Sequence, residues 1–563
     1  MSSALPGIHQ ISDQFVDDYA KLDPISATYI GIGGLDEQLT DYSPEGCAAR
    51  TELARRTLGA VREIEPINDS ERVAAAHITE RLGLDVEIHD AGLDVADLNV
   101  ISSPVQNIRQ VFDLMPTENA EQWAVVAARL ANVPGAVAGL RAGLSYAAEK
   151  GTVAALRQVT RCAEQCETWA GERGGESFFA SMVARAEEVG GVGETLRSEL
   201  TSAAEAAARA YGELAAFLRT ELAPKAPEKD AVGEDAYRLW SRYFTGANLE
   251  PREAYEWGWE EFSGIEREMT EVAGRVRRDA TLAEAAAALD ADPRYRVHGQ
   301  RAFEEWMQRL SDTALTELRG VHFDIPDELA VLECKIAPPG GGIGAYYTGP
   351  TDDFSRPGRM WWSVPADRED FSTWREVSTV YHEGVPGHHL QIATGVYQAK
   401  TLNRFQRLVG WVSGHGEGWA LYAERLMREL GYLADDGNLL GMLDSQLFRA
   451  ARVVVDIGMH LELEIPEGTG FHEGERWTPE LGLEFMLTRT ITDPAHVRDE
   501  IDRYLGWPGQ APSYKLGERL WLSAREEARR REGSAFDLKE FHKRSLELGS
   551  MGLDNLREQL SVL

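Results

Sequence analysis

The stretch YHEGVPGHH, residues 381–389, holds three histidines and one glutamate within nine positions. Imidazole and carboxylate groups are common ligands of divalent metal ions. In a frequent metal-binding helix, two histidines lie four positions apart, about one turn, so both rings reach one ion. Here the residue four positions after His382 is Pro386, and the next histidines are His388 and His389. A regular helix through this stretch therefore does not explain the cluster.

A metal site at this stretch requires that the helix be broken. On an ideal helix, the residue six positions after His382 points about 240° away, and the residue seven positions after it lies about 10 Å further along the axis. Val385-Pro386-Gly387 can supply the break, because proline lacks a backbone donor and glycine accepts conformations that other residues avoid. We predict that a bulge brings His388 beside His382 as the second ligand, and that His389 supports a ligand or faces the substrate. The alternative is a set of ordinary polar residues beside a helix kink.

A third ligand is predicted further along the chain. Glu417 lies 29 residues after His388, far enough for a loop and a return on a second helix. Two histidines and a glutamate with one open position form a catalytic zinc pattern. Glu424, two turns beyond Glu417, is expected to hydrogen-bond a ligand histidine. The alternative is a solvated helix face, but Trp419 and Tyr422 favour a buried helix, where an unpaired carboxylate is costly.

Other residues are predicted to take part in the chemistry. Glu383 follows a ligand histidine and is positioned to take a proton from a metal-activated water. Tyr514 follows a loop rich in proline and glycine, where its hydroxyl suits stabilisation of an oxyanion. Arg452 and His460 belong to a polar stripe on an apolar helix, with His460 as a catalytic candidate. A buried, self-satisfied ion network explains that stripe equally well.

Candidate substrate-binding residues come from two segments. Arg452 or Lys515 is predicted to bind a substrate carboxylate. Tyr346 and Tyr347 lie in a predicted strand, whose exposed edge offers amides that pair with an extended peptide. Aromatic packing is an equal or better explanation for the two tyrosines.

The motifs resemble known families. The segment EGWALYAE, residues 417–424, resembles the one that supplies the third zinc ligand in gluzincin aminopeptidases. HEGVPGH, from residue 382, resembles the His-Glu-Phe-Gly-His motif of thimet-oligopeptidase-like and angiotensin-converting-enzyme-like peptidases, with two residues inserted. HEGVPGHH together with RYLGWPGQAPSYK, residues 503–515, resembles the bacterial domain-of-unknown-function 885 family over most of the chain. The peptidase resemblance implies a mainly helical fold with a deep cleft, whereas the last family implies no established activity.

Composition narrows the class of protein. The chain has 563 residues, of which 43% are hydrophobic and 27% charged, as in globular proteins. Its net charge of -34 opposes binding to nucleic acid and to anionic membrane surfaces. We find no secretory signal and no run of about 18 apolar residues. The four cysteines suggest no disulfide framework, so we expect a cytoplasmic protein.

The chain divides into two predicted parts. Residues 1–230 are expected to form a helical subdomain, ending at the segment PKAPEKD, residues 224–230. Residues 231–563 are expected to form a catalytic helical subdomain, with a small sheet at about 329–365 and the metal motif at 381–424. The predicted fold is mainly α and gluzincin-like, with the sheet beside the active-site helix and a deep cleft between two helical halves.

The sequence thus predicts a hydrolase that holds one zinc ion on His382, His388 and Glu417, with Glu383 as general base. A short peptide is the expected substrate. Two alternatives stay open at this point: a zinc hydrolase of a non-peptide amide or ester, and a metal-free protein that only binds peptides.

Overall fold

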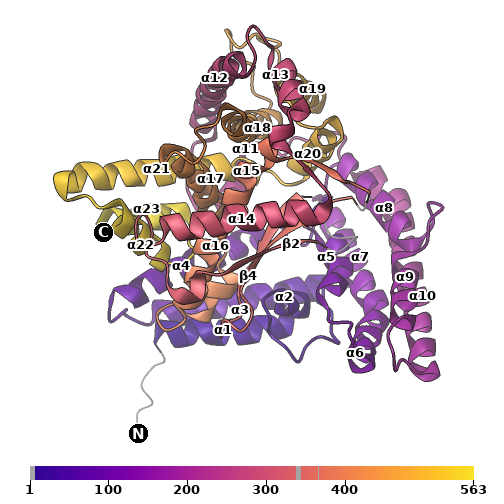
Figure 1. Ribbon diagram of the computed structural model, residues 1–563. Helices are drawn as coiled ribbons and strands as arrows, with labels where there is room; N and C mark the ends of the chain where they lie inside the picture. Colours follow the sequence, from indigo (N-terminus) through magenta and orange to yellow (C-terminus); the bar gives the residue numbers. More distant parts are fainter. Residues whose placement is uncertain (1–6, 338–343, 366, 563) are drawn as a thin grey trace. The chain divides into compact units, whose positions relative to one another are not determined.

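The structure is a computed structural model that describes residues 7–337, 344–365 and 367–562 (Figure 1). Within these limits the chain forms two compact units. Among the described residues, the first comprises 7–65, 82–231 and 502–507, and the second comprises 66–81, 232–501 and 508–562. Two short segments do not follow the boundary that the sequence suggests near residue 230. Residues 66–81 belong to the second unit, and residues 502–507 belong to the first.

The first unit is helical. Its helices, including short 3-10 (η1, η3) and π (η2) segments, are α1 (Ile8–Leu22), α2 (Pro24–Tyr29), α3 (Pro44–Arg62), α4 (Asp69–Asp90, shared with the second unit), α5 (Pro104–Gln110), η1 (Val111–Leu114), α6 (Ala120–Ala131), α7 (Val133–Glu149), α8 (Leu156–Ala170), α9 (Phe178–Glu187), α10 (Glu194–Phe217), η2 (Leu218–Leu222) and η3 (Ala223–Lys225).

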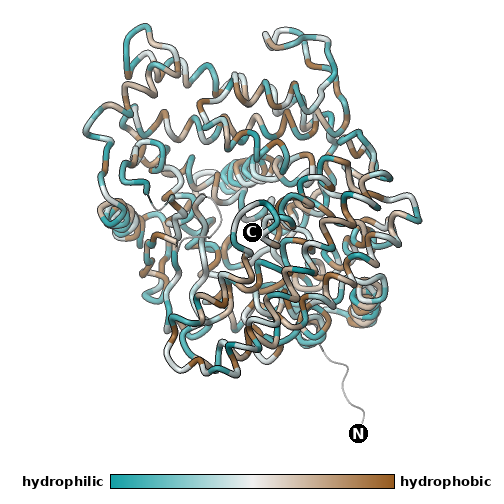
Figure 2. Tube along the Cα trace, turned by 90° about the vertical axis from the view of Figure 1, so that its right-hand side faces the viewer, coloured by the Kyte–Doolittle hydropathy of each residue, from teal (hydrophilic) through white to brown (hydrophobic). Residues whose placement is uncertain are grey.

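Helix α10 organises the core of this unit. It packs against α6, α7, α8 and α9. Its buried residues recur every three or four positions, including Leu200, Ala207, Tyr211 and Leu214, which is the spacing of an amphipathic helix. Figure 2 shows the same interleaving of apolar and polar positions along many helices of the chain. Burial of this apolar face holds the helices together.

One stretch of the described chain, Ala120–Glu149, is long and apolar enough to cross a membrane, judged by length and composition alone. The sequence prediction missed this stretch because polar residues interrupt its apolar run. Its mean hydropathy nevertheless stays high enough for a membrane span. In the structure this stretch forms α6 and α7, which meet at Asn132, and half of its most apolar part is buried. Trp123, Leu130 and Leu140 belong to the core of the first unit, so packing already covers much of its apolar side.

The second unit contains the remaining helices and all strands that the structure describes. These elements are α11 (Glu234–Thr245), α12 (Pro251–Val276), α13 (Leu282–Ala291), η4 (Pro293–Tyr295), β1 (Arg296–His298), α14 (Gln300–Leu318), η5 (Asp327–Leu329), β2 (Leu332–Ile336), β3 (Gly344–Thr348), β4 (Gly358–Ser363), β5 (Asp370–Ser372), α15 (Thr373–Glu383), α16 (His388–Tyr397), η6 (Phe405–Val409), α17 (Ser413–Glu429), α18 (Asp436–Leu461), α19 (Pro479–Arg489), α20 (Pro494–Gly506, shared with the first unit), α21 (Ser513–Glu532), η7 (Gly533–Ala535), α22 (Leu538–Glu547) and α23 (Leu553–Val562).

Helices α15, α17 and α18 carry several of the residues of interest in this unit. Helix α15 packs against both α17 and α18. Helix α17 also packs against α21, and α18 also packs against α12. The start of α18 is fixed by Asp435, whose carboxylate accepts hydrogen bonds from the backbone of Gly437 and Asn438 at 3.0 and 3.1 Å. The three helices are therefore held in one packed arrangement.

The main sheet precedes α15 in the chain and packs against α14, α15 and α16. Its strand order is β2-β4-β3, with β2 parallel and β3 antiparallel to β4. In register, Leu332 pairs with Gly358 and Tyr346 pairs with Trp361. Strand β3 forms one edge of the sheet and contacts α15. The predictions of a mainly helical fold and of a small sheet at about 329–365 are confirmed, whereas the pair β1–β5 was not predicted.

Candidate metal centre

The helix that begins at Thr373 ends at Glu383, and a new helix begins at His388. The backbone between them makes its own bonds: Gly387 N donates to Tyr381 O at 3.0 Å, and His389 N donates to Gly384 O at 3.1 Å. The predicted break is present, but it is longer than the expected two-residue bulge. It separates two helices, α15 and α16.

Glycine is required at position 387 for a steric reason. A Cβ atom there would lie 1.9 Å from the carbonyl oxygen of His382. The close approach of Gly387 to the end of α15 is what turns the chain back. A larger residue would push the start of α16 away from His382.

We expect Gly387→Ala to lower the free energy of unfolding by about 1–3 kcal/mol, the usual cost of overpacking. The matched control is Gly395→Ala within α16, where a Cβ meets no atom within 4 Å. That change is expected to be neutral or stabilising, because alanine favours helix. Urea unfolding of both variants tests the expectation, and equal stabilities would show that the turn tolerates a side chain.

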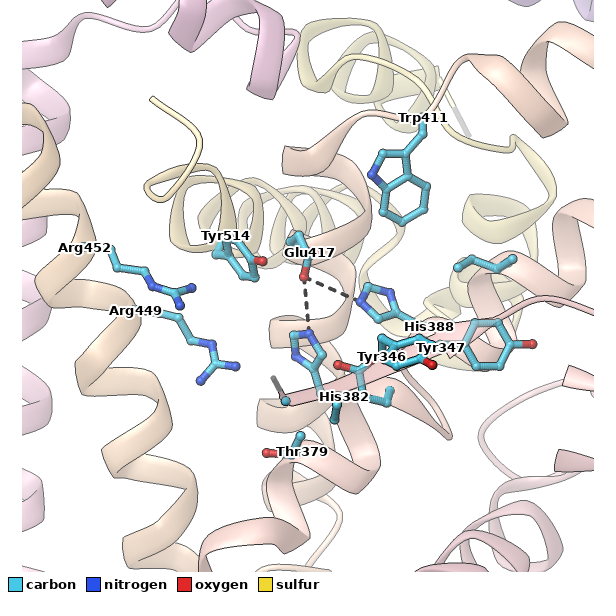
Figure 3. Close-up of a pocket in the computed structure, with 14 residues that line it drawn as sticks. Tyr346, Tyr347, Thr379, His382, His388, Trp411, Glu417, Arg449, Arg452 and Tyr514 are labelled. Atoms are coloured by element: carbon cyan, nitrogen blue, oxygen red, sulfur yellow. Dashed lines mark hydrogen bonds and ion pairs between the residues drawn. The ribbon is translucent and has the colours of Figure 1, made fainter. Parts of the chain in front are cut away.

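Three helices bring His382, His388 and Glu417 together (Figure 3). One carboxylate oxygen of Glu417 lies 3.3 Å from Nε2 of His382 and 3.5 Å from Nε2 of His388. The two imidazole rings are 4.9 Å apart, centre to centre, and nearly perpendicular. Both histidines are buried. Two imidazole nitrogens and one carboxylate oxygen facing one point form a donor set that suits zinc.

A second carboxylate also reaches this group. Ligand atoms of His382, Glu383 and His388 all lie within 4.8 Å of one another. Glu383 is buried as well. Of the two glutamates, Glu417 is the one with an oxygen in short contact with both Nε2 atoms.

Glu424 fixes the orientation of His382. Its Oε1 lies 2.8 Å from His382 Nδ1, and its Oε2 accepts a hydrogen bond from Ser378 Oγ at 2.6 Å. Glu424 is completely buried. Because the Nδ1–H group donates a hydrogen bond to this carboxylate, Nε2 is left to face Glu417 and His388. This carboxylate–histidine pair is typical of metal sites.

Burial and charge set the pKa values of the cluster. Burial acts to lower the pKa of His382, but hydrogen bonds with Glu417 and Glu424 raise it to about 9. Burial acts to raise the pKa of Glu417, but the charge of His388 and hydrogen bonds with both histidines hold it well below its usual range. Burial raises the pKa of Glu383. Glu417 therefore stays ionised, whereas Glu383 holds a proton more readily than an exposed glutamate.

The cluster opens into a cavity of about 410 Å³ within the second unit. Several predicted residues line it: Tyr346, Tyr347, Arg452 and Tyr514, besides His382, Glu383, His388 and Glu417. Four of its other lining residues were missed from the sequence: Thr379, Ile392, Trp411 and Arg449. Arg449 had a usable signal, because it lies three positions before Arg452 on α18 and so shares a helix face with it.

Two predicted residues lie elsewhere. His460 is buried with its ring 5.7 Å from that of Tyr237, and it is not among the residues that line the cavity. Lys515 is fully buried, and its Nζ donates to Glu261 and Gln446 at 2.8 Å each, with Glu518 also bound. The structure therefore places His460 and Lys515 outside the lining of the cavity, where the sequence suggested catalytic and substrate-binding roles.

Helix geometry explains why neither side chain lines the cavity. His460 is eight positions after Arg452, so it is rotated by about 80° and lies about 12 Å along the axis. Lys515 follows Tyr514 directly and points about 100° away from it. Asp456, in the same stripe as His460, accepts hydrogen bonds from Tyr237 Oη at 2.7 Å and Gly509 N at 3.0 Å. These hydrogen bonds favour the internal polar network for that part of the stripe.

His389 turns away from the histidine pair. Its Nδ1 lies 3.0 Å from the hydroxyl of Tyr347, and its Nε2 lies 2.8 Å from the backbone oxygen of Leu329. Both ring nitrogens are thus engaged, and His388 alone of the two faces Glu417. His389 instead fixes Tyr347, while Tyr346 is 41% exposed on the edge strand β3.

Comparison with known proteins gives a fold and a family. A "putative lipoprotein" from Colwellia psychrerythraea has a similar structure, with a TM-score of 0.83 and 24% identity over 99% of this chain and 98% of that chain. A "putative lipoprotein of unknown function" from Shewanella oneidensis has a TM-score of 0.74 and 18% identity over 99% of this chain and 100% of that chain. These likenesses concern the fold alone, and no curated protein matches the chain. The chain belongs to the family of bacterial proteins of unknown function called DUF885, which it matches over residues 24–560.

Proposed function

We propose that the protein is a zinc-dependent hydrolase whose zinc ligands are His382, His388 and Glu417. The observation that carries this proposal is the position of one Glu417 oxygen, 3.3 and 3.5 Å from the Nε2 atoms of the two histidines. The three residues come from three helices, and α16 begins at His388 directly after the break. Two buried histidines and a partly buried carboxylate beside an open cavity have a high desolvation cost unless they serve a charged ligand.

Glu383 is proposed as the general base and Glu417 as the ligand. Glu417 is the ionised carboxylate, with its pKa held low by the charge of His388 and by hydrogen bonds with both histidines despite burial. Glu383 has a pKa raised by burial. A base that must take up a proton and release it again near neutral pH benefits from such a shift.

In the proposed hydrolysis, zinc, Glu383 and Tyr514 have separate roles. Bound zinc supplies a Lewis acid that makes water more acidic near neutral pH. A carboxylate oxygen of Glu383 takes the proton of the attacking water as the water oxygen bonds to the carbonyl carbon. Glu383 returns this proton to the nitrogen as the carbon–nitrogen bond breaks. The hydroxyl of Tyr514, which lines the same cavity, is proposed to donate to the developing oxyanion.

A short peptide is the substrate that we propose. Strand β3 lines the cavity and forms the edge of its sheet, where an extended chain can add as a further strand. The gluzincin-like relationship and the deep cleft that the sequence suggests belong to this proposal too. Hydrolysis of a non-peptide amide or ester uses the same residues, so only substrates separate it from peptide hydrolysis.

The direct test is metal content together with activity. After incubation with zinc and desalting, elemental analysis is expected to find one zinc ion per chain. The protein is then assayed with a panel of short peptides, small amides and esters. Removal of zinc by a chelator is expected to lower the rate by at least about 100-fold, because a Lewis acid contributes several kcal/mol. One equivalent of zinc should restore the rate. Absence of stoichiometric metal would favour a metal-free peptide-binding protein.

Glu424 gives a more specific test of the same centre. We expect Glu424→Gln to weaken zinc affinity by about 10- to 100-fold, the usual effect of losing a carboxylate behind a histidine ligand. The control is Glu429→Gln on the same helix, whose carboxylate pairs with Arg525 at 2.9 Å. Competition with a coloured chelator measures both affinities. Equal affinities in the two variants would separate Glu424 from the metal centre.

A further inference from the structure

Arg449 is a cation in the cavity that forms no ion pair among the described residues. It extends from α18 and lines the cavity with Glu383, Glu417 and Tyr514. Its Nη1 bonds only to Ser445, one turn earlier on the same helix, with the backbone oxygen at 3.2 Å. Its Nε is buried and has no hydrogen-bond partner among the described residues. No carboxylate of the described part of the chain forms an ion pair with this guanidinium.

The neighbouring arginine differs in this respect. Arg452, on the same helix, forms a buried ion pair with Glu500 at 2.7 Å, and its guanidinium lies 4.9 Å from the centre of the Tyr514 ring. Its charge is thus balanced within the protein. The chain has 92 acidic and 58 basic residues, so acidic partners for an arginine are plentiful. The lack of one at Arg449 leaves a positive charge directed at the cavity.

The position of this charge indicates where a substrate anion would sit. In Figure 3, Arg449 and Arg452 lie on one side of the His382–His388–Glu417 cluster, and Trp411 lies on the other. Glu383, the proposed base, lines the same cavity as Arg449. Glu383 delivers its proton to the leaving nitrogen, so an anionic group on the leaving portion of the substrate would be bound within this cavity by Arg449.

We propose that Arg449 binds the free C-terminal carboxylate of a short peptide, so that the enzyme releases C-terminal residues. This inference rests on the proposed hydrolase function and names its substrate class. The planar guanidinium matches a carboxylate and holds it with two parallel hydrogen bonds. A guanidinium without an ion-pair partner suits a carboxylate with one negative charge. A doubly charged phosphate would be repelled by Glu383 and Glu417.

The test compares a peptide with its amide. The tripeptide Ala-Ala-Leu and its C-terminal amide are assayed with the wild-type protein and with Arg449→Gln. Hydrogen bonds to charged groups are worth about 1.5–3 kcal/mol, so the wild type should prefer the free acid by about 10- to 150-fold in kcat/KM. In Arg449→Gln this preference should largely disappear. Arg449→Lys keeps the charge and should keep part of it, while zinc content shows that each variant is folded.

A control and a binding measurement complete the design. Arg428→Gln, on α17, removes an arginine that pairs with Glu268 and does not line the cavity, and it should keep the preference of the wild type. Calorimetry in a Glu383→Gln background measures the affinity for the acid and the amide without turnover. An affinity that is the same for both, or a preference that survives Arg449→Gln, overturns the inference while the hydrolase proposal stands. Absence of zinc and of all hydrolysis overturns the hydrolase proposal instead, and calorimetry still decides whether Arg449 selects carboxylates.

Discussion

Glu383→Gln is expected to lower kcat/KM by about 10²- to 10⁴-fold, the range for loss of a general acid–base group, while zinc binding is retained. Glutamine has the size of glutamate but cannot take up the proton of water. Glu383 is the last residue of α15, directly after His382, and its amide replacement removes no atom that holds the backbone turn. The measurement is steady-state hydrolysis of the best peptide found, alongside elemental analysis of zinc.

The control for this change lies on the same helix. Glu376, two turns before Glu383, is also a carboxyl whose pKa burial raises, and it does not line the cavity. Glu376→Gln should therefore leave the rate within about threefold of the wild type, as surface or structural changes away from a site usually do. Full activity of homogeneous Glu383→Gln would remove this residue from the role of base and return attention to Glu417.

The break between the two helices could be predicted from local chemistry. Pro386 cannot donate a backbone hydrogen bond, and the spacing of the histidines has no solution on a straight helix. The need to bring His388 beside His382 followed from these two facts. What the sequence did not contain was the extent of the break, because it depends on how closely Gly387 approaches the carbonyl of His382.

Residues whose role depends on the absence of a partner could not be predicted. Arg449 and Arg452 look alike in the sequence, three positions apart on one helix. Only the fold shows that Glu500 reaches Arg452, whereas no described carboxylate forms an ion pair with Arg449. In the same way, only packing shows that Lys515 is buried among Glu261, Gln446 and Glu518. Spacing along a helix identifies shared faces, but the identity of the facing element is a tertiary property.

Helix α17 also illustrates why Glu417 was easier to predict than Trp411. Glu417 and Glu424 lie two turns apart among apolar residues, a pattern that is costly unless the carboxylates have partners. The partners are now identified: His388 and His382 for Glu417, and His382 and Ser378 for Glu424. An aromatic residue in a loop, such as Trp411, gives no comparable signal, since exposed single aromatics are common.

Glu417→Gln is expected to weaken zinc affinity by more than about 100-fold. This loss should exceed that of Glu424→Gln, because Glu424 acts on the proposed metal only through His382. The change removes the negative charge that faces both Nε2 atoms at 3.3 and 3.5 Å and replaces one oxygen with a group that cannot bind metal. Chelator competition should then rank the variants, with the largest loss for Glu417→Gln, a smaller one for Glu424→Gln and none for Glu429→Gln. Thermal unfolding without zinc checks that the Glu417 variant is folded.

The same series decides between the two carboxylates that reach the histidine pair. Since ligand atoms of His382, Glu383 and His388 lie within 4.8 Å of one another, Glu383 is the competing ligand. If Glu383→Gln lost zinc and Glu417→Gln kept it, the two roles would have to be exchanged, with Glu417 as the base. The pKa directions oppose this exchange: histidine charge and hydrogen bonds hold Glu417 ionised against burial, whereas burial favours the protonated form of Glu383. A metal ligand must be ionised and a base must accept a proton, so these pKa directions support the proposal that Glu417 binds the metal and Glu383 acts on the water.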